Sequence, residues 1–344
     1  MSIQIPVLAK SAQYPPVPLA GPAVRATPAG GLPDQSAPSG AGTAKPTTVA
    51  DLLTARQAQS ERREGSSILI YGGPRTGKTL LAATIAKIPY IRRVFWFDLE
   101  KGIETLIYAR KGDGSPYFTK EELAKIILFN VKDTSDRPVA ATTLLKAFSA
   151  TQPIPICQAH GAIACKEGCL PADHIPFSLR TCNWEDAVVI DSGSQLADSV
   201  LNMEKALYQY KDLRKYYGEF NLDMGSILGA IQASSTNVVM VTHDMEIYEG
   251  VDPDKRFVGI FPNCGSQNFS RKVARSFGYV IYNLIELNRF KAGSGPMFKP
   301  KVLTGSRTGV AIETTEGATL VDLLLPQPAQ PATKPTQETK PTMP

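Results

Sequence analysis

The sequence predicts an α/β fold in which a mostly parallel central sheet is flanked by helices. Short apolar runs typical of buried strands recur along the chain. Stretches with helical periodicity separate these runs, and several runs end in a glycine, a carboxylate or a histidine. Strands that alternate with helices form parallel sheets, in which the carboxyl ends of the strands meet at one edge and bind ligands. We therefore expect the polar residues at the strand ends to form one site.

The first predicted strand, residues 67–71, leads into a glycine-rich loop and then a helix at residues 80–87. The loop matches the phosphate-binding pattern G-x-x-x-x-G-K-[ST] at every fixed position. Its glycines allow a tight turn whose backbone N–H groups face a phosphate chain, and the helix N-terminus adds partial positive charge. Lys78 is expected to bind the β- and γ-phosphates of ATP, and the Thr79 hydroxyl to bind Mg²⁺. The predicted nucleotide-binding residues are Gly72, Gly73, Pro74, Arg75, Thr76, Gly77, Lys78, Thr79 and Leu80.

The two ends of the chain differ in composition from its middle. Residues 1–47 are dense in Pro, Ala and Gly, and residues 326–344 consist mainly of Pro, Gln, Thr, Ala and Lys. Such segments bury too little apolar surface to offset the entropy lost on ordering, so both are predicted to be disordered tails. Residues 48–325 form the predicted folded domain, beginning with a helix within residues 48–63. The Pro-rich tails are candidate docking arms for protein partners.

The charge balance and the cysteine content limit the class of protein. The net charge is +5, and the tails account for three of these charges, which leaves about +2 for the folded body. A nucleic-acid site would therefore have to come from local patches. No N-terminal signal and no apolar run of about 18 residues is present, so we expect a soluble, cytoplasmic protein without membrane contact. Five cysteines in that compartment indicate free thiols or a metal site.

An aromatic-rich strand predicted within residues 93–102 ends in two carboxylates separated by one residue. They are Asp98 and Glu100, and alternation would place both on one side of the strand end. A carboxylate at this edge of the sheet would face the γ-phosphate. The residues alone leave both as candidates for the general base.

The strand predicted over residues 184–191 ends in Asp191, where an aspartate would hold Mg²⁺ together with Thr79. An aspartate that caps the next helix is the alternative. A further strand at residues 237–244 ends near Thr242 and His243, either of which is a candidate sensor of the γ-phosphate. A core or helix-capping histidine is the alternative for His243.

The remaining predicted elements continue the alternation. They are a helix, a strand at 125–131 and a helix at 140–150, then two helices within 194–234, a long irregular segment at 246–270, and strands at 279–287 and 296–303.

The order of these motifs resembles that of the RecA-type ATPases. The stretches GGPRTGKT, FWFDLEKGIETLIYARK, AVVIDSGSQLAD and NVVMVTHD carry the resemblance, which spans residue 66 to about residue 310. Asp191 is followed by Ser192 rather than by the glutamate typical of AAA+ proteins. The additional carboxylate lies instead on the strand after the phosphate-loop helix, which carries Asp98 and Glu100. The chain is similar to short phage-encoded RecA-like proteins labelled AAA-domain nucleotide-binding or single-strand annealing proteins.

This resemblance implies an Mg²⁺-dependent ATPase in which Lys78 and Thr79 bind phosphate and magnesium. It implies Glu100 as the general base, Asp191 as a magnesium ligand and His243 as the sensor that signals to a DNA-binding loop at residues 246–270. It further implies that the protein self-associates as a ring or filament on single-stranded DNA and acts in recombination or annealing. Lys299, Lys301 or Arg307 would then reach a neighbouring subunit's γ-phosphate.

An insertion at residues 151–183 interrupts the α/β pattern. It contains Cys157, His160, Cys165 and Cys169, with the spacing C-x2-H-x4-C-x3-C. Four such ligands suit tetrahedral Zn²⁺, and an ion held by four protein ligands is structural rather than catalytic. Reduced cysteines without a metal are the alternative.

A second function remains open from the sequence. The chain would be a nucleotide-dependent switch, loader or scaffold that does not bind DNA directly. The nearly neutral body and the Pro-rich tails favour this alternative.

Overall fold

The computed structural model describes residues 65–134, 136–165, 167–208, 212–287, 289–295, 301–307, 313–315 and 319–324. The tails predicted at 1–47 and 326–344, and the helix predicted within 48–63, lie outside these residues. All described residues belong to one compact unit. The domain boundaries at 47/48 and 325/326 stay predictions.

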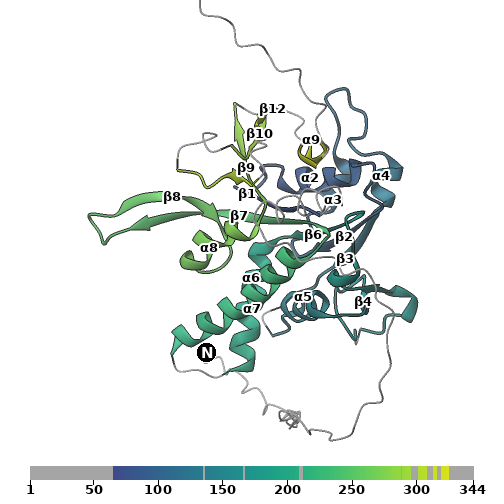
Figure 1. The fold of residues 1–344 in the computed structure, drawn as a ribbon, viewed down its shortest axis with the longest axis horizontal. Coiled ribbons are helices and arrows are strands. Elements are labelled where there is room, and N and C mark those ends of the chain that lie inside the picture. Colours follow the sequence, from purple (N-terminus) through teal and green to yellow (C-terminus); the bar gives the residue numbers. More distant parts are fainter. Residues whose placement is uncertain are drawn as a thin grey trace, which may run out of the picture. The chain divides into compact units, whose positions relative to one another are not determined.

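A ten-stranded sheet forms the centre of this unit, with the strand order β12-β10-β9-β1-β7-β6-β2-β3 (Figure 1). The strands from β9 to β3 in this order run parallel, which confirms the predicted sheet. β8 pairs antiparallel with β7, and β10, β11 and β12 form an antiparallel margin beside β9. The strands are β1 Ser67–Gly72, β2 Arg93–Asp98, β3 Ile126–Asn130, β6 Asp186–Asp191, β7 Asn237–Glu249, β8 Arg256–Pro262, β9 Tyr279–Glu286, β10 Arg289–Gly293, β11 Gly305–Ser306 and β12 Glu313–Thr315.

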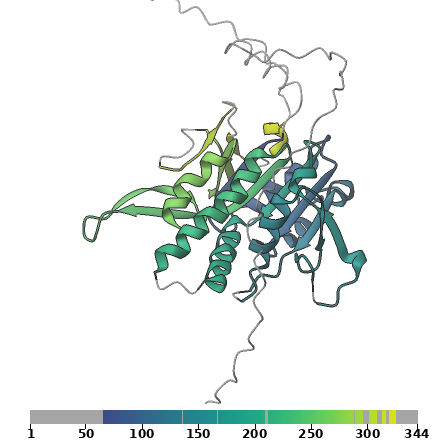
Figure 2. The ribbon, with the colours of Figure 1, turned by 60° about the horizontal axis from the view of Figure 1, so that its bottom comes forward.

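Helices cover both faces of the sheet, because alternate residues of each buried strand enter separate cores. In β1, Ile68 and Ile70 belong to one core, whereas Leu69 and Tyr71 belong to the other. The first core includes residues of α2 (Lys78–Ala83), η1 (Thr84–Lys87), α3 (Glu104–Tyr108), α4 (Lys120–Ala124) and α9 (Leu320–Leu324). The second includes residues of α5 (Val139–Ser149), α6 (Gly193–Leu207), α7 (Leu213–Ala233) and α8 (Gln267–Val273). The result is a three-layer α/β arrangement (Figure 2).

The segment predicted to be irregular at residues 246–270 is ordered, so that prediction is wrong. β7 continues past the sheet to Glu249 and pairs with β8, and α8 follows. The β7–β8 hairpin (residues 244–262) projects beyond the central sheet (Figures 1 and 2). Both of its faces are partly exposed and only Ile247 of the outer part of β7 is buried, so the apolar alternation that signals a strand is weak.

Two other predicted elements differ in their bounds. The helix after the phosphate loop begins at Lys78 and becomes a 3₁₀ helix at Thr84. The last strand was expected at 296–303, but residues 301–303 are not in a strand and residues 296–300 lie outside the described part. β10 at residues 289–293 pairs with β9 instead.

The insertion at residues 151–183 is tied to the core. It contains β4 (Ile154–Cys157) and β5 (His174–Phe177), which pair antiparallel, and two short 3₁₀ helices, η2 (Pro171–Asp173) and η3 (Leu179–Thr181). The buried Phe177 ring contacts Phe95, Phe97 and Phe129 on the sheet. The insertion is therefore packed on the sheet and is not a detached flap.

Candidate functional site

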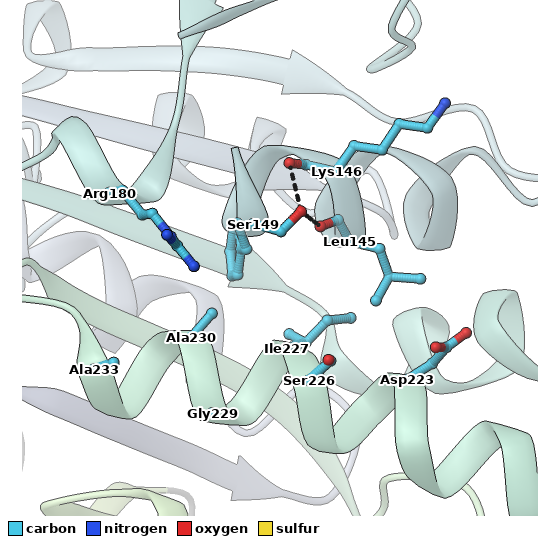
Figure 3. A pocket seen from close by; sticks show the side chains of 11 residues that line it. Leu145, Lys146, Ser149, Arg180, Asp223, Ser226, Ile227, Gly229, Ala230 and Ala233 are labelled. Carbon is cyan, nitrogen blue, oxygen red and sulfur yellow. Dashed lines mark hydrogen bonds between the residues drawn. The ribbon is translucent and has the colours of Figure 1, made fainter. Parts of the chain in front are cut away.

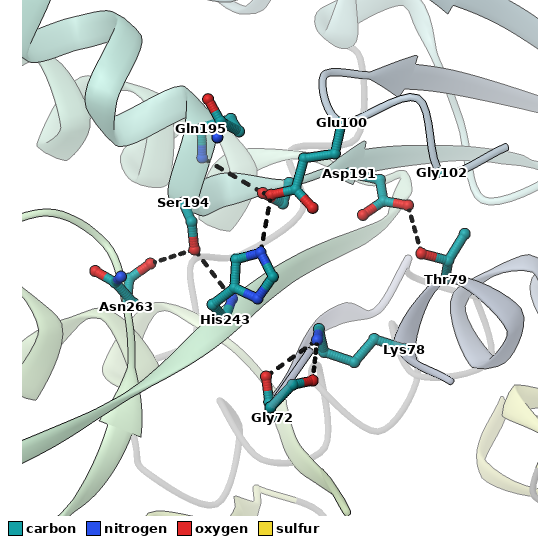
Figure 4. A network of polar contacts seen from close by, with 12 residues as sticks. Gly72, Lys78, Thr79, Glu100, Gly102, Asp191, Ser194, Gln195, His243 and Asn263 are labelled. Carbon is teal, nitrogen blue, oxygen red and sulfur yellow. Dashed lines mark hydrogen bonds and ion pairs between the residues drawn. The ribbon is translucent and has the colours of Figure 1, made fainter. Parts of the chain in front are cut away.

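The phosphate loop lies between β1 and α2, at the carboxyl end of the strand. Gly77 has a φ of 81°, a left-handed conformation that glycine adopts without strain, and it is the N-cap of α2. The Lys78 side chain is buried, and its Nζ donates hydrogen bonds to Gly72 O (3.0 Å) and Gly73 O (2.6 Å) (Figure 4). Burial lowers the pKa of Lys78, whereas nearby acidic side chains raise it. The ammonium therefore lies at the mouth of the loop.

The other predicted loop residues surround this lysine. Thr76 is buried and its Oγ1 donates to Gly73 O at 2.9 Å, which tightens the turn. Pro74 and Arg75 are exposed, and Arg75 has a left-handed φ of 60°. Leu80 is partly buried at the start of α2.

Thr79 and Asp191 meet although 112 positions separate them in the chain. Thr79 Oγ1 donates to Asp191 Oδ2 at 2.9 Å. Asp191 is 2% exposed, and its pKa is raised to about 7, chiefly because burial disfavours the charged form, while the bond from Thr79 acts in the opposite direction. Ser192, not Asp191, caps α6 by accepting from Gln195 N, so the capping alternative for Asp191 is wrong.

The two predicted carboxylates have different partners. Asp98 is the last residue of β2 and Glu100 lies in the turn beyond it, so the prediction that strand alternation places both on one side is wrong. β2 ends at Asp98, and Lys101 adopts a left-handed φ of 58°, so the chain turns there. Asp98 accepts hydrogen bonds from the backbone N–H groups of Gly102 (2.9 Å) and Ile103 (3.3 Å). Burial raises the pKa of Asp98, and these bonds lower it.

Glu100 lies on the turn and faces two side chains, Ser192 at the N-cap of α6 and His243 of β7. Its Oε1 accepts from Ser192 Oγ and lies 3.1 Å from His243 Nε2. The side chains of Glu100 and His243 are 26% and 36% exposed. The site is thus open to solvent at Glu100 and closed at Asp191.

His243 also connects the site to the β7–β8 hairpin. The His243 N–H donates to Ser194 Oγ at 3.0 Å, and Ser194 Oγ donates to Asn263 O at 2.9 Å. The backbone N–H of Asn263 donates in turn to His243 O at 2.8 Å. Both ends of the hairpin are therefore bonded close to Glu100 (Figure 4).

Gly102 belongs to the site and was not predicted from the sequence. A Cβ on Gly102 would lie 3.2 Å from Asp191 Oδ2 and 3.3 Å from Thr79 Oγ1. Only a residue without a side chain leaves this space open beside the two oxygens. Ser192 was also not predicted as a partner of Glu100, because hydrogen bonds between distant residues leave no sequence pattern.

Two cavities differ in their relation to the site. A cavity of about 650 Å³ adjoins the phosphate loop at Thr76, Gly77 and Leu80, and Phe290 and Asn283 line its other side. Another, of about 510 Å³, lies between α5 and α7 and includes Arg180 and Asp223 (Figure 3). The second cavity contains none of the predicted site residues.

The four predicted zinc ligands come together in the insertion, apart from the phosphate loop. Their ligand atoms all lie within 4.8 Å of one another. His160 Nδ1 is 3.6 Å from Cys157 Sγ, 3.5 Å from Cys165 Sγ and 3.3 Å from Cys169 Sγ. The Cys165 and Cys169 sulfur atoms are 3.9 Å apart.

The strand, glycine-rich loop and helix, with the aspartate of a neighbouring strand bonded to the loop threonine, define a P-loop ATPase. The chain belongs to the AAA domain family, whose model matches residues 64–307. The predicted α/β fold and ATPase class are thereby confirmed. A P-loop ATPase binds a nucleotide and usually Mg²⁺.

Other comparisons give distant likenesses. No curated protein matches the chain. A prototypical ATPase from the type III secretion system of pathogenic bacteria is 15% identical with a TM-score of 0.38, over 71% of this chain and 58% of that one. The RadB recombinase is 14% identical with a TM-score of 0.35, over 73% of this chain and 87% of that one. Among the described residues, no helix has the length and apolar character to cross a membrane.

Proposed function

We propose that this ATPase hydrolyses Mg²⁺-ATP with Glu100 as the general base and acts on single-stranded DNA through the β7–β8 hairpin. Lys78 and the backbone N–H groups of the loop bind the phosphates, and Thr79 and Asp191 hold the magnesium. Two observations fit the ion: the space beside Gly102 that a Cβ would fill, and a buried carboxylate whose pKa is raised to about 7. When bound, Mg²⁺ neutralises the charge that develops on the phosphate oxygens.

The surroundings of the two carboxylates favour Glu100 over Asp98 as the base. Asp98 is buried, and both of its oxygens accept backbone N–H groups, so it holds the turn in place. Glu100 is partly exposed and is oriented by Ser192 and His243. A partly exposed carboxylate held by side chains has the access that proton transfer from water requires. His243 is the proposed sensor, because it joins this carboxylate to the hairpin.

The cavity beside the loop is the proposed site of the base and ribose. It is continuous with Thr76 and Gly77, and the Phe290 ring would lie 3.2 Å from a Cβ at Gly77. Asn283 Oδ1 is buried and has no hydrogen-bond partner among the described residues. Both a ring face and a free acceptor suit an adenine base.

One observation carries the proposed link to DNA: β7 runs without interruption from the centre of the sheet, past His243, into the exposed hairpin. Tyr248 and Phe257 pack together there with ring centres 5.4 Å apart, and Lys301 Nζ lies 5.1 Å from the Phe257 ring. Tyr248 is exposed and Phe257 is half-buried. Aromatic rings with adjacent cations bind single-stranded bases by stacking. Recombination or annealing on DNA, by a ring or filament of subunits, is the role we propose.

Self-association would bring a cation to the neighbouring site. Lys301 Nζ donates to Phe257 O, and Arg307 Nη2 donates to Arg275 O. Lys299 lies outside the described residues. Lys301 and Arg307 are therefore the described candidates for a residue that acts on the adjacent subunit's phosphate.

The acidic character of the hairpin favours a second candidate function. Residues 244–262 contain five acidic side chains and two basic ones. Such a surface repels phosphate and suits a basic protein partner. In this alternative the protein is a nucleotide-dependent switch, loader or scaffold, with the Pro-rich tails as docking arms, and it works in the cytoplasm.

The rate of ATP hydrolysis with and without single-stranded DNA, over a salt series, separates the two functions. DNA binding predicts stimulation that fades as salt rises. The Tyr248→Ala variant should then lose stimulation but keep the basal rate. Tyr217→Ala is the matched control, because Tyr217 is 43% exposed on α7 and Tyr248 is 42% exposed on the hairpin. No stimulation at low salt would reject DNA in favour of the switch.

We also propose that the Cys/His cluster binds Zn²⁺. Zn–S bonds of about 2.3 Å and Zn–N bonds of about 2.0–2.1 Å at tetrahedral angles place nitrogen about 3.6 Å from sulfur and the sulfur atoms about 3.8 Å apart. The corresponding distances of 3.3–3.6 Å and 3.9 Å support this geometry. Metal analysis should give about one zinc per chain in the wild type and in Cys182→Ser, and little in Cys165→Ser. Less than about half an equivalent in the wild type rejects the proposal.

A further inference from the structure

β3 is the outermost strand on one side of the central sheet among the described residues. Successive backbone groups of an edge strand point alternately toward the neighbouring strand and away from the sheet. Val131 N, for example, donates inward to Asp98 O at 2.9 Å. The groups at Leu128, Asn130 and Lys132 point outward, where an uncovered strand would pair with another chain.

The Cys/His loop (residues 157–165 and 167–169) binds these outward groups. Asn130 N donates to Gln158 O at 2.7 Å, and Lys132 N donates to His160 O at 3.3 Å. Gln158 Nε2 donates to Leu128 O at 3.4 Å. The spacing of two residues along β3 shows that the loop follows the edge as a strand would.

Close contact between the loop and the edge depends on Gly161. Its φ is 62°, and a Cβ there would lie 2.6 Å from Val131 Cγ2 and 2.9 Å from Val131 Cα. Gly161 N also donates to Cys157 O at 2.8 Å, which closes the turn that holds His160. The proposed ligands Cys157 and His160 therefore lie on either side of Gln158, the residue that accepts the hydrogen bond from Asn130.

We infer that Zn²⁺ in the Cys/His cluster holds this loop over β3, and that loss of the ion uncovers an adhesive edge for a second copy of this chain. The inference rests on the zinc site proposed above. The segment from Lys125 to Val131 is KIILFNV, which is apolar, β-branched and without proline, the composition of strands that pair between chains. Backbone bonds alone hold the loop weakly, since it has few buried apolar residues of its own, and a tetrahedral ion joins both of its ends.

Amide hydrogen exchange on the full-length protein tests this inference, comparing the purified protein with protein treated with a zinc chelator. Without zinc, the amides of Asn130 and Lys132 should exchange at least about tenfold faster, whereas the amide of Val131 should keep its rate. The alternation distinguishes an uncovered edge from an unfolded strand. Equal acceleration at all three amides, or none at any, overturns the inference.

A variant separates the failure of this inference from the failure of the zinc proposal. Gly161→Ala keeps all four ligands but places a methyl group against Val131. It should accelerate exchange at Asn130 and Lys132 even with zinc bound. If exchange at these amides is unchanged in this variant, the loop does not protect the β3 edge, whatever the metal content. If the purified wild-type protein contains no zinc, the metal site is rejected instead.

Association provides the second measurement. Protein treated with a zinc chelator should form larger oligomers than the zinc-bound protein, as measured by light scattering at equal protein concentration. A charge on the exposed edge, Asn130→Lys, should suppress that association, and Gln232→Lys on α7 should not. Association that Asn130→Lys leaves unchanged does not use this edge and contradicts the inference.

Discussion

Replacing Asp191 with asparagine should stabilise the nucleotide-free protein at alkaline pH. The pKa of Asp191 is raised from 3.8 to about 7, chiefly by burial. One pKa unit corresponds to about 1.4 kcal/mol, so the shift corresponds to about 4 kcal/mol. Since the folded pKa exceeds the unfolded value, the carboxyl's contribution to stability is fully present below pH 3.8 and is lost as pH rises through about 7. Asparagine carries no charge and can still accept a hydrogen bond from Thr79.

Urea unfolding at pH 5 and pH 8, without metal or nucleotide, measures this effect. The free energy of unfolding of Asp191→Asn relative to wild type should rise between the two pH values by about 2–3 kcal/mol, because most of the titration lies in that interval. Adding Mg²⁺-ATP at pH 8 should then stabilise the wild type and leave the variant nearly unchanged.

Asp186→Asn at the opposite end of β6 is the matched control. Asp186 is 2% exposed, but it accepts hydrogen bonds from Arg93 Nε (2.8 Å) and Nη2 (3.0 Å). Its substitution should lower stability by about 1–3 kcal/mol at both pH values. A raised pKa of Asp191 is refuted if Asp191→Asn is no more stable than wild type at pH 8, or if its advantage is the same at pH 5.

Three further predictions concern the ATPase site. Glu100→Gln should lower kcat by about 10²–10⁴-fold with ATP binding retained, whereas Asp98→Asn should have a smaller effect; equal losses in steady-state kinetics would contradict the assignment of the base. Gly102→Ala should raise the Mg²⁺ concentration needed for half-maximal rate, while Gly225→Ala, a glycine of α7 with open space around its Cβ position, should not. Magnesium affinity should fall about tenfold per pH unit below about 7, because Asp191 must lose its proton to bind the ion. Calorimetry at pH 6 and pH 8 measures this affinity, and equal values would exclude the raised pKa of Asp191.

Local patterns were sufficient for the fold class and for the phosphate loop. A buried strand, a glycine-rich turn and a helix are determined by residues close together in the chain, so Lys78 and Thr79 could be predicted directly. The hairpin at 244–262 could not be predicted, because both faces of its strands are partly exposed and their charged residues interrupt the apolar alternation. The turn after Asp98 likewise depends on backbone bonds from Gly102 and Ile103.

The sequence by itself determined the α/β architecture and the phosphate-loop motif, and it predicted Asp191 and the Cys/His group as sites, since each is a pattern of neighbouring residues. The tertiary structure alone decided how these residues combine. It gave Glu100 and Asp98 different hydrogen-bond partners and placed Gly102 against the Thr79–Asp191 pair. It also bonded the Cys/His loop to the edge of β3. These contacts join residues far apart in the chain, and their distances are set by the packing of strands and helices, which no local pattern records.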